Sequence, residues 1–253
     1  MIIIIISLFI LIFILLFDCS RVRNPPLSIS IYKYPENHRK ILFTSLIYLS
    51  NLNKVFYPCS KIKEHTYFTN NFQQIKNEFL QTINKIKPKK WYEYDKSLGK
   101  LNNYEVIYIK FFKIIEKNAQ KFPKLYNIIK NMDNALIVYF AIMKGKTYLK
   151  PHRAFYNGVL RYHYPIIVNP NDKSFIQING IKKYWKENEP FLFDDTYEHF
   201  VIKNNNYTRV VLIIDFLRPL PKLLQKINKK ILFDSPQVIE TDIYKDTYEI
   251  KII

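Results

Sequence analysis

Seven short runs rich in Val, Ile, Phe and Tyr follow Asp133, and this pattern constrains the fold more than any other feature of the sequence. Gly, Asn, Asp and Pro separate the runs, and no helical pattern lies between them. We expect strands at Ala135–Met143, Val159–Val168, Ser174–Ile178, Lys182–Trp185, Pro190–Phe193, Phe200–Lys203 and Thr208–Phe216. Closely spaced strands without intervening helices predict an antiparallel sandwich or barrel, so the fold class is mainly β.

Helical patterns precede and follow the strand region. Apolar residues at helical spacing, ended by Pro88, predict an amphipathic helix; they are Phe72, Ile75, Phe79, Leu80, Ile83 and Ile86. Two more helices are expected at Val106–Glu116 and Phe122–Asn131, and Pro123 suits the first turn of the latter. The segment Pro221–Leu232 has an apolar face and several lysines. We expect it to pack against the domain, and the alternative is a position on a membrane surface.

The first seventeen residues carry no charge and are almost purely aliphatic. At about 1.5 Å per residue, such a run is just long enough to cross a hydrocarbon core of roughly 30 Å. We therefore expect residues 1–17 to form a transmembrane anchor; a cleaved signal is the alternative, although a basic n-region and an A-x-A-like site are missing. Basic residues that follow, starting with Arg21 and Arg23, favour a single-pass protein with its globular part on the cytoplasmic face.

The charge balance bears on possible partners. Lys and Arg number 39 against 21 Asp and Glu, which gives a net charge of +18 and favours an anionic partner such as a membrane surface. The abundance of Ile, Asn, Lys, Tyr and Phe offers a compositional explanation for the same charge. No nucleic-acid-binding motif is present, so no nucleic acid is expected. Two cysteines are too few for a disulfide framework or a thiolate metal site.

Three of the five histidines, His152, His163 and His199, fall in the strand region. His152 comes just before one predicted strand, and His199 lies at the head of another. Two imidazoles delivered from strand edges suit iron(II), which takes nitrogen and oxygen ligands and needs open positions for co-substrate and dioxygen. The spacing by itself is equally compatible with two structural histidines.

Two arginines strengthen the metal-site interpretation. Arg209 begins the apolar strand Thr208–Phe216, where an inward guanidinium needs an anion, and a dicarboxylate such as 2-oxoglutarate would supply one. Arg161 and His163 are two residues apart, so in a strand they share a face. The alternative is that Arg161 and His163 face solvent on an edge strand.

Three segments resemble the aspartyl/asparaginyl β-hydroxylase family of Fe(II)- and 2-oxoglutarate-dependent oxygenases. They are Lys150–His163, which contains Pro151-His152, Tyr184–His199, which contains Phe193-Asp194-Asp195-Thr196, and 206–219, which contains Arg209 and Asp215. The resemblance implies a double-stranded β-helix, a cupin-like jelly roll. It also implies that His152 and His199 bind the metal, that Arg209 binds a 2-oxoglutarate carboxylate, and that Arg161 and His163 line the co-substrate and substrate pocket.

The branch of the family is suggested by the Tyr156-x-Gly158 step and by the Arg21-Val22-Arg23 sequence after the apolar segment, which are similar to bacterial lipid A 2-hydroxylases. That branch has a carboxylate at the position of Ala154, where this chain has none. The family's co-substrate serine would fall near Phe140 or Ala141, and here no hydroxyl is present. The candidate replacements are Thr147, Tyr139 and Tyr148.

These features lead us to expect an Fe(II)- and 2-oxoglutarate-dependent hydroxylase that acts on a peptidyl Asp or Asn or on a lipid acyl chain. The alternatives are a catalytically inactive, membrane-tethered β-helix scaffold and a cupin-like sugar isomerase, against which the pair Arg161 and Arg209 argues. The expected organisation is an anchor or signal (1–17), a juxtamembrane connector (18–69), an oxygenase domain (70–233) and a C-terminal tail (234–253). Within the domain, helices occupy 70–131 and the β-helix core 135–219.

Overall fold

The computed structural model describes residues 37–50, 52–91, 101–154 and 156–233. The predicted anchor at 1–17 and the tail at 234–253 lie outside the described residues. The chain divides into two compact units, Met1–Arg39 and Lys40–Ile253, and the sheets and the pocket belong to the second. None of the helices in the described ranges combines the length and apolar character that crossing a membrane requires.

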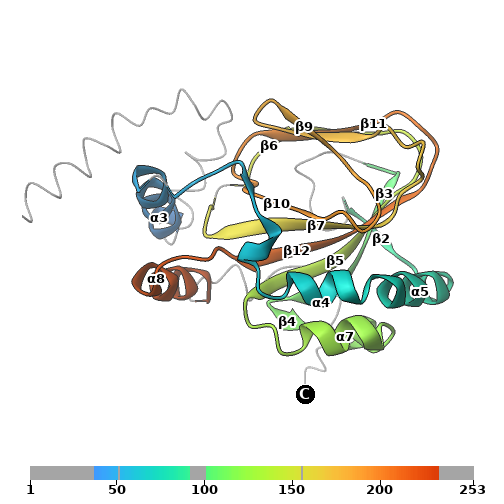
Figure 1. Cartoon of the computed structure of the whole chain (residues 1–253), viewed down its shortest axis with the longest axis horizontal. Helices are drawn as coiled ribbons and strands as arrows, with labels where there is room; N and C mark the ends of the chain where they lie inside the picture. Colours follow the sequence, from blue (N-terminus) through green and yellow to red (C-terminus); the bar gives the residue numbers. More distant parts are fainter. Residues whose placement is uncertain (1–36, 51, 92–100, 155, 234–253) are drawn as a thin grey trace, which may run out of the picture. The chain divides into compact units, whose positions relative to one another are not determined.

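Two antiparallel sheets face each other in this unit (Figure 1). The larger sheet contains, in order, β1 (Phe56–Tyr57), β10 (Phe191–Phe193), β7 (Val159–Ile167), β12 (Arg209–Leu217), β5 (Ala135–Met143), β3 (Tyr104–Phe111) and β2 (Lys89–Lys90), with β4 (Lys113–Ile114) beside β3. The smaller sheet contains β6 (Thr147–His152), β11 (His199–Lys203), β8 (Phe175–Ile178) and β9 (Ile181–Tyr184). Facing antiparallel sheets of this kind form a jelly roll, which confirms the predicted fold class.

Helices cover only the outer face of the larger sheet. In Figure 1, α4 (His65–Asn70), α5 (Phe72–Thr82) and α7 (Pro123–Ile129) lie on the side of this sheet away from the smaller one. The fully buried Phe140 of β5 packs against Phe79 of α5 and Phe122 at the start of α7, with ring centres 4.8 and 5.0 Å apart. Its neighbours Tyr139 and Ala141 point the opposite way, into the space between the sheets, as strand alternation requires.

All seven predicted strands are confirmed to within about two residues, and so are the helices predicted from the Phe72 and Phe122 patterns. One hairpin shows why the turns could be read from the sequence. β8 and β9 are joined by Asn179 and Gly180, both at positive φ (45° and 82°), a conformation that Asn and Gly adopt readily in a tight hairpin.

The helix predicted at Val106–Glu116 is wrong. Most of this segment is β3, a strand paired with β5 and β2, and only α6 (Glu116–Ala119) is helical. All but the last residue of β3 is buried, because helices cover one face and the smaller sheet covers the other. A strand buried on both faces carries apolar residues on both, so its sequence lacks the regular alternation that distinguishes a strand from a helix.

The predicted connector at 18–69 also contains regular structure where it is described. From residue 37 it forms α3 (Asn37–Leu49), β1 and α4, and β1 adds an edge strand to the larger sheet beside β10. The connector prediction was too simple here, because a two-residue strand directly before Pro58 is too short to show an alternating pattern.

The segment after the last strand packs against the domain, as expected. It forms α8 (Lys222–Phe233), whose Leu232 belongs to a buried cluster with Phe43 of α3 and Leu217 of β12. The close approach is possible because residue 158 is Gly. A Cβ there would lie 2.1 Å from the Asn228 Oδ1 atom of α8. Asn228 instead donates to the Gly158 carbonyl, 2.7 Å away.

Candidate active site

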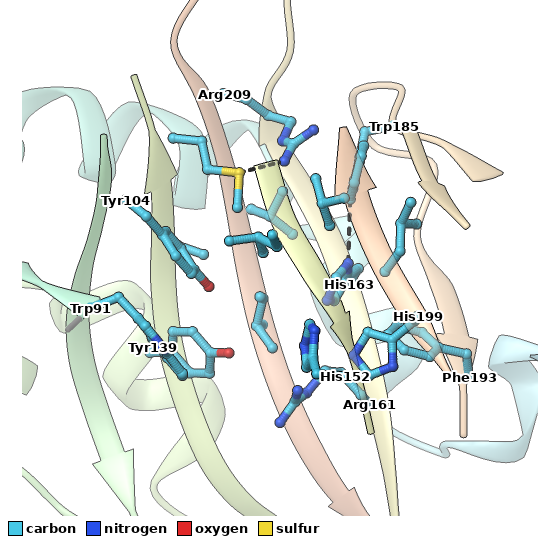
Figure 2. A pocket seen from close by; sticks show the side chains of 17 residues that line it. Trp91, Tyr104, Tyr139, His152, Arg161, His163, Trp185, Phe193, His199 and Arg209 are labelled. Carbon is cyan, nitrogen blue, oxygen red and sulfur yellow. Dashed lines mark hydrogen bonds between the residues drawn. The ribbon is translucent and has the colours of Figure 1, made fainter. Parts of the chain in front are cut away.

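A pocket opens between the two sheets and contains about 580 Å³ of empty space, including its mouth. All five residues singled out from the sequence line it: His152, Arg161, His163, His199 and Arg209. Figure 2 shows Arg209 and Trp185 at one end, the rings of His152 and His199 at the other, and His163 between them.

The two predicted metal ligands face each other across neighbouring strands. His199 of β11 is the direct register partner of His152 of β6, and the register shifts just after this pair. The two ring centres are 4.2 Å apart, with an interplanar angle of 56°. The pairing therefore brings two residues together that are far apart in sequence.

Both imidazoles are held in the same tautomer. Nδ1 of His152 is 2.7 Å from the Lys150 carbonyl oxygen, and Nδ1 of His199 is 2.8 Å from the Tyr197 carbonyl oxygen. A carbonyl only accepts, so each Nδ1 donates and each Nε2 carries the lone pair. Burial, with a contribution from His152, lowers the pKa of His199 to about 3, which keeps this ring neutral. Neutral rings oriented by Nδ1–H bonds to carbonyls are typical of metal-binding histidines.

A rigid turn leads into His199. The buried Asp194 carboxylate accepts hydrogen bonds from the backbone N–H of Thr196, at 3.0 Å, and from its hydroxyl, at 2.6 Å. Asp194 also pairs with the buried Arg218 of the segment after β12. The Asp194-Asp195-Thr196 sequence thus fixes the direction in which the chain enters β11.

Arg209 is a buried charge that has no carboxylate partner among the residues the structure describes. Arg209 is only 2% exposed. Burial lowers the pKa of its guanidinium more than the negative charge of Asp172 raises it, so the pKa falls to about 10. Its Nη2 donates to the Met143 sulfur at 2.8 Å, a weak acceptor, and its Nη1 has no hydrogen-bond partner in the described part of the chain. An orphaned guanidinium lining a pocket is a site for an anionic ligand.

Trp185, which the sequence reasoning did not single out, contacts both Arg209 and His163. The Arg209 guanidinium carbon lies 3.6 Å from the centre of the Trp185 ring system. The indole Nε1 donates to Nδ1 of His163 at 3.3 Å. Burial, together with the charges of Arg161 and Arg209, lowers the pKa of His163 well below its usual value, so this ring is neutral. Trp185 lies directly after the end of β9, and no periodic signal in the sequence marks it as a site residue.

Arg161 lines the pocket, as the resemblance implies, but its charge is already paired within the protein. Its Nε and Nη2 donate to the two carboxylate oxygens of Asp215, each at 2.8 Å, and its Nη1 lies 3.1 Å from Asp195. Burial opposes the charge of Arg161, but these carboxylates raise its pKa well above the usual value. Burial raises the pKa of Asp195 to about 7. Since Arg161 already has anionic partners, its charge does not call for a dicarboxylate ligand.

The strand register separates the two arginines. Arg209 pairs with Met143, which pairs with Tyr104, so these three lie in one row across β12, β5 and β3. Asp215, the partner of Arg161, is six residues further along β12, about 20 Å at the rise of a strand. One dicarboxylate therefore does not account for both arginines, contrary to expectation. Arg161 is paired with carboxylates of the protein, and Arg209 is the arginine of this pair that can bind a dicarboxylate.

Hydroxyl groups do reach the pocket, though not from the expected position. Ala141 lines the pocket and Phe140 faces the helices, so neither supplies a hydroxyl. Three residues were candidates to replace the family's co-substrate serine. Tyr139 lines the pocket, whereas Tyr148 is 50% exposed and Thr147 donates to the Gly145 carbonyl. Tyr104 was missed because β3 was predicted to be a helix. Burial raises its pKa to about 12, so it is a neutral donor.

Ala154 occupies the position of the expected carboxylate, and its backbone N–H donates to the Asp195 carbonyl. In the described residues no three His, Cys, Asp or Glu side chains converge as a metal site. The protein donors at the candidate metal position are thus two imidazoles.

Fold and pocket together define a jelly-roll protein with an internal site made of paired histidines and a buried arginine whose Nη1 has no partner in the part of the chain that the structure describes. The chain belongs to the aspartyl/asparaginyl beta-hydroxylase family, whose sequence model matches residues 69–219. This match covers both histidines, Arg209 and all strands from β2 to β12.

Known relatives support a hydroxylase. The chain is 35% identical over 114 residues to the ornithine lipid ester-linked acyl 2-hydroxylase of Rhizobium tropici, which covers 45% of this chain and 41% of that protein. It is 30% identical over 80 residues to the human aspartyl/asparaginyl beta-hydroxylase, which covers 32% of this chain and 10% of that protein. The chain thus spans less than half the length of these relatives.

A solved structure with a related fold is an oxidoreductase of the 2OG-Fe(II) oxygenase family from Burkholderia pseudomallei. The match has a TM-score of 0.38 and 8% identity, and covers 47% of this chain and 70% of that one.

Proposed function

We propose that this protein is a hydroxylase that depends on ferrous iron and 2-oxoglutarate. The observation that carries the proposal is the buried guanidinium of Arg209, which has no carboxylate partner in the described ranges and shares one pocket with His152 and His199. A dicarboxylate bound by Arg209 at one end and directed toward His152 and His199 at the other would account for both features.

The histidine pair fits a single metal ion. When two imidazoles bind one ion through metal–nitrogen bonds of about 2 Å, and the two bonds are at a right angle, the ring centres lie roughly 4.5 Å apart. The observed separation is 4.2 Å. His152 and His199 would therefore hold the iron through Nε2, and the absence of a carboxylate at Ala154 leaves more positions for exogenous ligands. Bound iron would supply the activation of dioxygen that couples 2-oxoglutarate decarboxylation to hydroxylation.

The protein's own residues bind and orient the co-substrate. Arg209 would pair with the far carboxylate of 2-oxoglutarate, where its fork geometry matches two carboxylate oxygens. The hydroxyl of Tyr104 is in the same cross-strand row and would add a donor at that carboxylate. The aromatic walls formed by Tyr139, Trp185 and Phe193 would exclude water from the reacting centre.

A lipid acyl chain is the favoured substrate. The match to the acyl 2-hydroxylase has higher identity over a longer segment than the match to the peptidyl enzyme. The aliphatic segment 1–17 and the charge of +18 would both keep this protein at an anionic membrane. A peptidyl Asp or Asn is the second candidate, supported by the human relative.

Uncoupled turnover tests the proposal without knowledge of the substrate. The purified full chain should release succinate from 2-oxoglutarate only when ferrous iron is supplied. The variants His152→Ala, His199→Ala and Arg209→Ala should lose at least about 100-fold of this activity, since each removes a ligand or a buried charge pair. Arg153→Ala is the matched control, because its side chain is 44% exposed and pairs with Glu198 on the surface.

Metal and co-substrate binding distinguish the rival interpretations. An active hydroxylase should bind about one iron per chain after anaerobic reconstitution, and His199→Ala should not. A chain that binds neither iron nor 2-oxoglutarate would be the inactive scaffold. Iron binding without any effect of 2-oxoglutarate would favour the isomerase.

A further inference from the structure

We propose that Trp185 is the positioning residue of the co-substrate site, and this inference rests on the proposed function. The face of its indole holds the Arg209 guanidinium, and its N–H fixes the tautomer of His163. One side chain would thereby arrange two hydrogen-bond donors for a single ligand. Trp185 itself need not touch the ligand's reacting atoms.

The first contact restrains Arg209. The guanidinium carbon lies 3.6 Å from the centre of the Trp185 ring, which is stacking distance. The Met143 sulfur accepts from Nη2 on one edge. Stacking leaves the in-plane edge of a guanidinium open to an acceptor, and Nη1 is the nitrogen without a partner. A flexible side chain is thus held in one orientation before any ligand arrives, which lowers the entropy cost of binding.

The second contact selects the tautomer of His163. The planes of the two rings differ by only 18°, and Nε1 of Trp185 donates to Nδ1 of His163 at 3.3 Å. An indole N–H can only donate, so Nδ1 must accept, and the imidazole proton must be on Nε2. His163 lines the pocket with Arg209 and therefore offers this N–H as a second donor.

The two contacts are coupled through one rigid ring. Trp185 is 3% exposed and also packs against Phe191, with ring centres 6.2 Å apart, so it has little freedom to move. If the indole were displaced, the Arg209 guanidinium would change direction, and the imidazole proton of His163 would no longer be restricted to Nε2. A purely structural tryptophan would affect neither.

Trp185→Phe separates these contacts, since Phe keeps an aromatic face but has no N–H. It should weaken 2-oxoglutarate binding to the metal-free full chain by between about twofold and tenfold, the range for one neutral hydrogen bond. Trp185→Leu loses both contacts and should weaken binding by about 30-fold or more. Calorimetry on metal-free protein gives the dissociation constants and does not depend on enzyme activity.

Two further measurements report on the two contacts of Trp185. Nitrogen-15 spectra of wild-type protein should show His163 protonated on Nε2, and Trp185→Phe should give a mixture of tautomers. Only two tryptophans exist in the chain, so Trp91→Phe makes Trp185 the sole indole emitter. In that variant 2-oxoglutarate should change the emission, whereas pyruvate, which has no second carboxylate, should not.

The outcomes separate this inference from the proposed function. If wild-type protein fails to bind 2-oxoglutarate, the proposed function fails and the inference fails with it. If wild type binds and Trp185→Phe keeps the same affinity and the same His163 tautomer, only the role of Trp185 is overturned. Emission of Trp185 that is insensitive to bound 2-oxoglutarate would also overturn it.

Discussion

Arg161 and Arg209 show how two residues of one type, in adjacent strands of one sheet, differ in function through their partners. Arg161 has a bidentate partner in Asp215 and a second carboxylate in Asp195. Arg209 has an aromatic face and a thioether. The sequence predicted that both face inward, and this is confirmed. It could not show which charge was already compensated, because Asp215 is a partner only through strand pairing.

Asp215→Asn should lower the free energy of unfolding by about 3 kcal/mol, because it breaks a largely buried ion pair and leaves Arg161 with the weaker Asp195 contact. Urea denaturation followed by circular dichroism measures the change. The control is Lys186→Ala, which breaks the exposed pair with Glu189 and should cost less than about 1 kcal/mol. Equal effects of the two variants would contradict a structural role for the Arg161–Asp215 pair.

At the scale of elements, the strands were predictable where turn residues bounded them and the central strand β3 was not. β7 and β12 are also buried on both faces, yet their ends are marked by Gly158 and by Arg209. β6 was missed because it contains Lys150 and Pro151 and alternates around an exposed Tyr148. Among the strands that were not predicted, β3 and β6 contribute to the pocket, since Tyr104 lies on β3 and His152 ends β6.

The start of α7 offers a prediction at the element scale. Glu78 of α5 accepts from the backbone N–H groups of Lys124, at 2.6 Å, and Leu125, at 3.0 Å, so it caps a different helix. Glu78→Ala should destabilise the domain by about 1–2 kcal/mol, because it removes both acceptors and a charge favourable to a helix N-terminus.

Thermal unfolding of Glu78→Ala, Glu78→Gln and wild type provides the measurement. Glu78→Gln keeps one acceptor and should fall between the other two. Glu116→Ala, at an exposed position in the first turn of α6, is the control and should change stability by less than about 0.5 kcal/mol. A Glu78→Ala protein as stable as the control would show that the cap adds little.

At the scale of the whole domain, the active site is assembled from both sheets. The smaller sheet supplies His152 and His199, and the larger sheet supplies Arg209, His163 and Tyr104. The sequence could indicate the histidines and Arg209 because the family resemblance spans them. The enclosure of the pocket by Trp91, Trp185 and the tyrosines depends on how the sheets face each other, which no local pattern determines.

The outer surface of α8 gives a prediction about membranes. Leu223 and Ile227 are 70% and 40% exposed, and the lysines at 222, 226, 229 and 230 are exposed beside them. A helix with apolar and basic side chains on its exposed face suits an anionic bilayer. Lys226→Glu with Lys230→Glu should therefore weaken binding to vesicles that contain phosphatidylglycerol by roughly tenfold or more.

Vesicle flotation of the full chain measures this binding. Vesicles of phosphatidylcholine alone should bind wild type and variant equally, since residues 1–17 do not differ between them. The control pair Lys85→Glu with Lys87→Glu makes the same charge change near the end of α5, which Figure 1 places at the opposite end of the domain from α8. Equal loss in both double variants would assign the effect to net charge.

The register of His152 and His199 limits how this protein can change in length. Inserting or deleting one residue within β6 or β11 would turn one imidazole to the outside of the sheet, because side chains alternate between faces. The Asn179–Gly180 hairpin tip belongs to the same sheet, yet a Cβ at Gly180 would meet nothing within 4 Å. Natural variation in loop length, and any grafted specificity loop, should therefore occur at this hairpin tip and spare the two histidine strands.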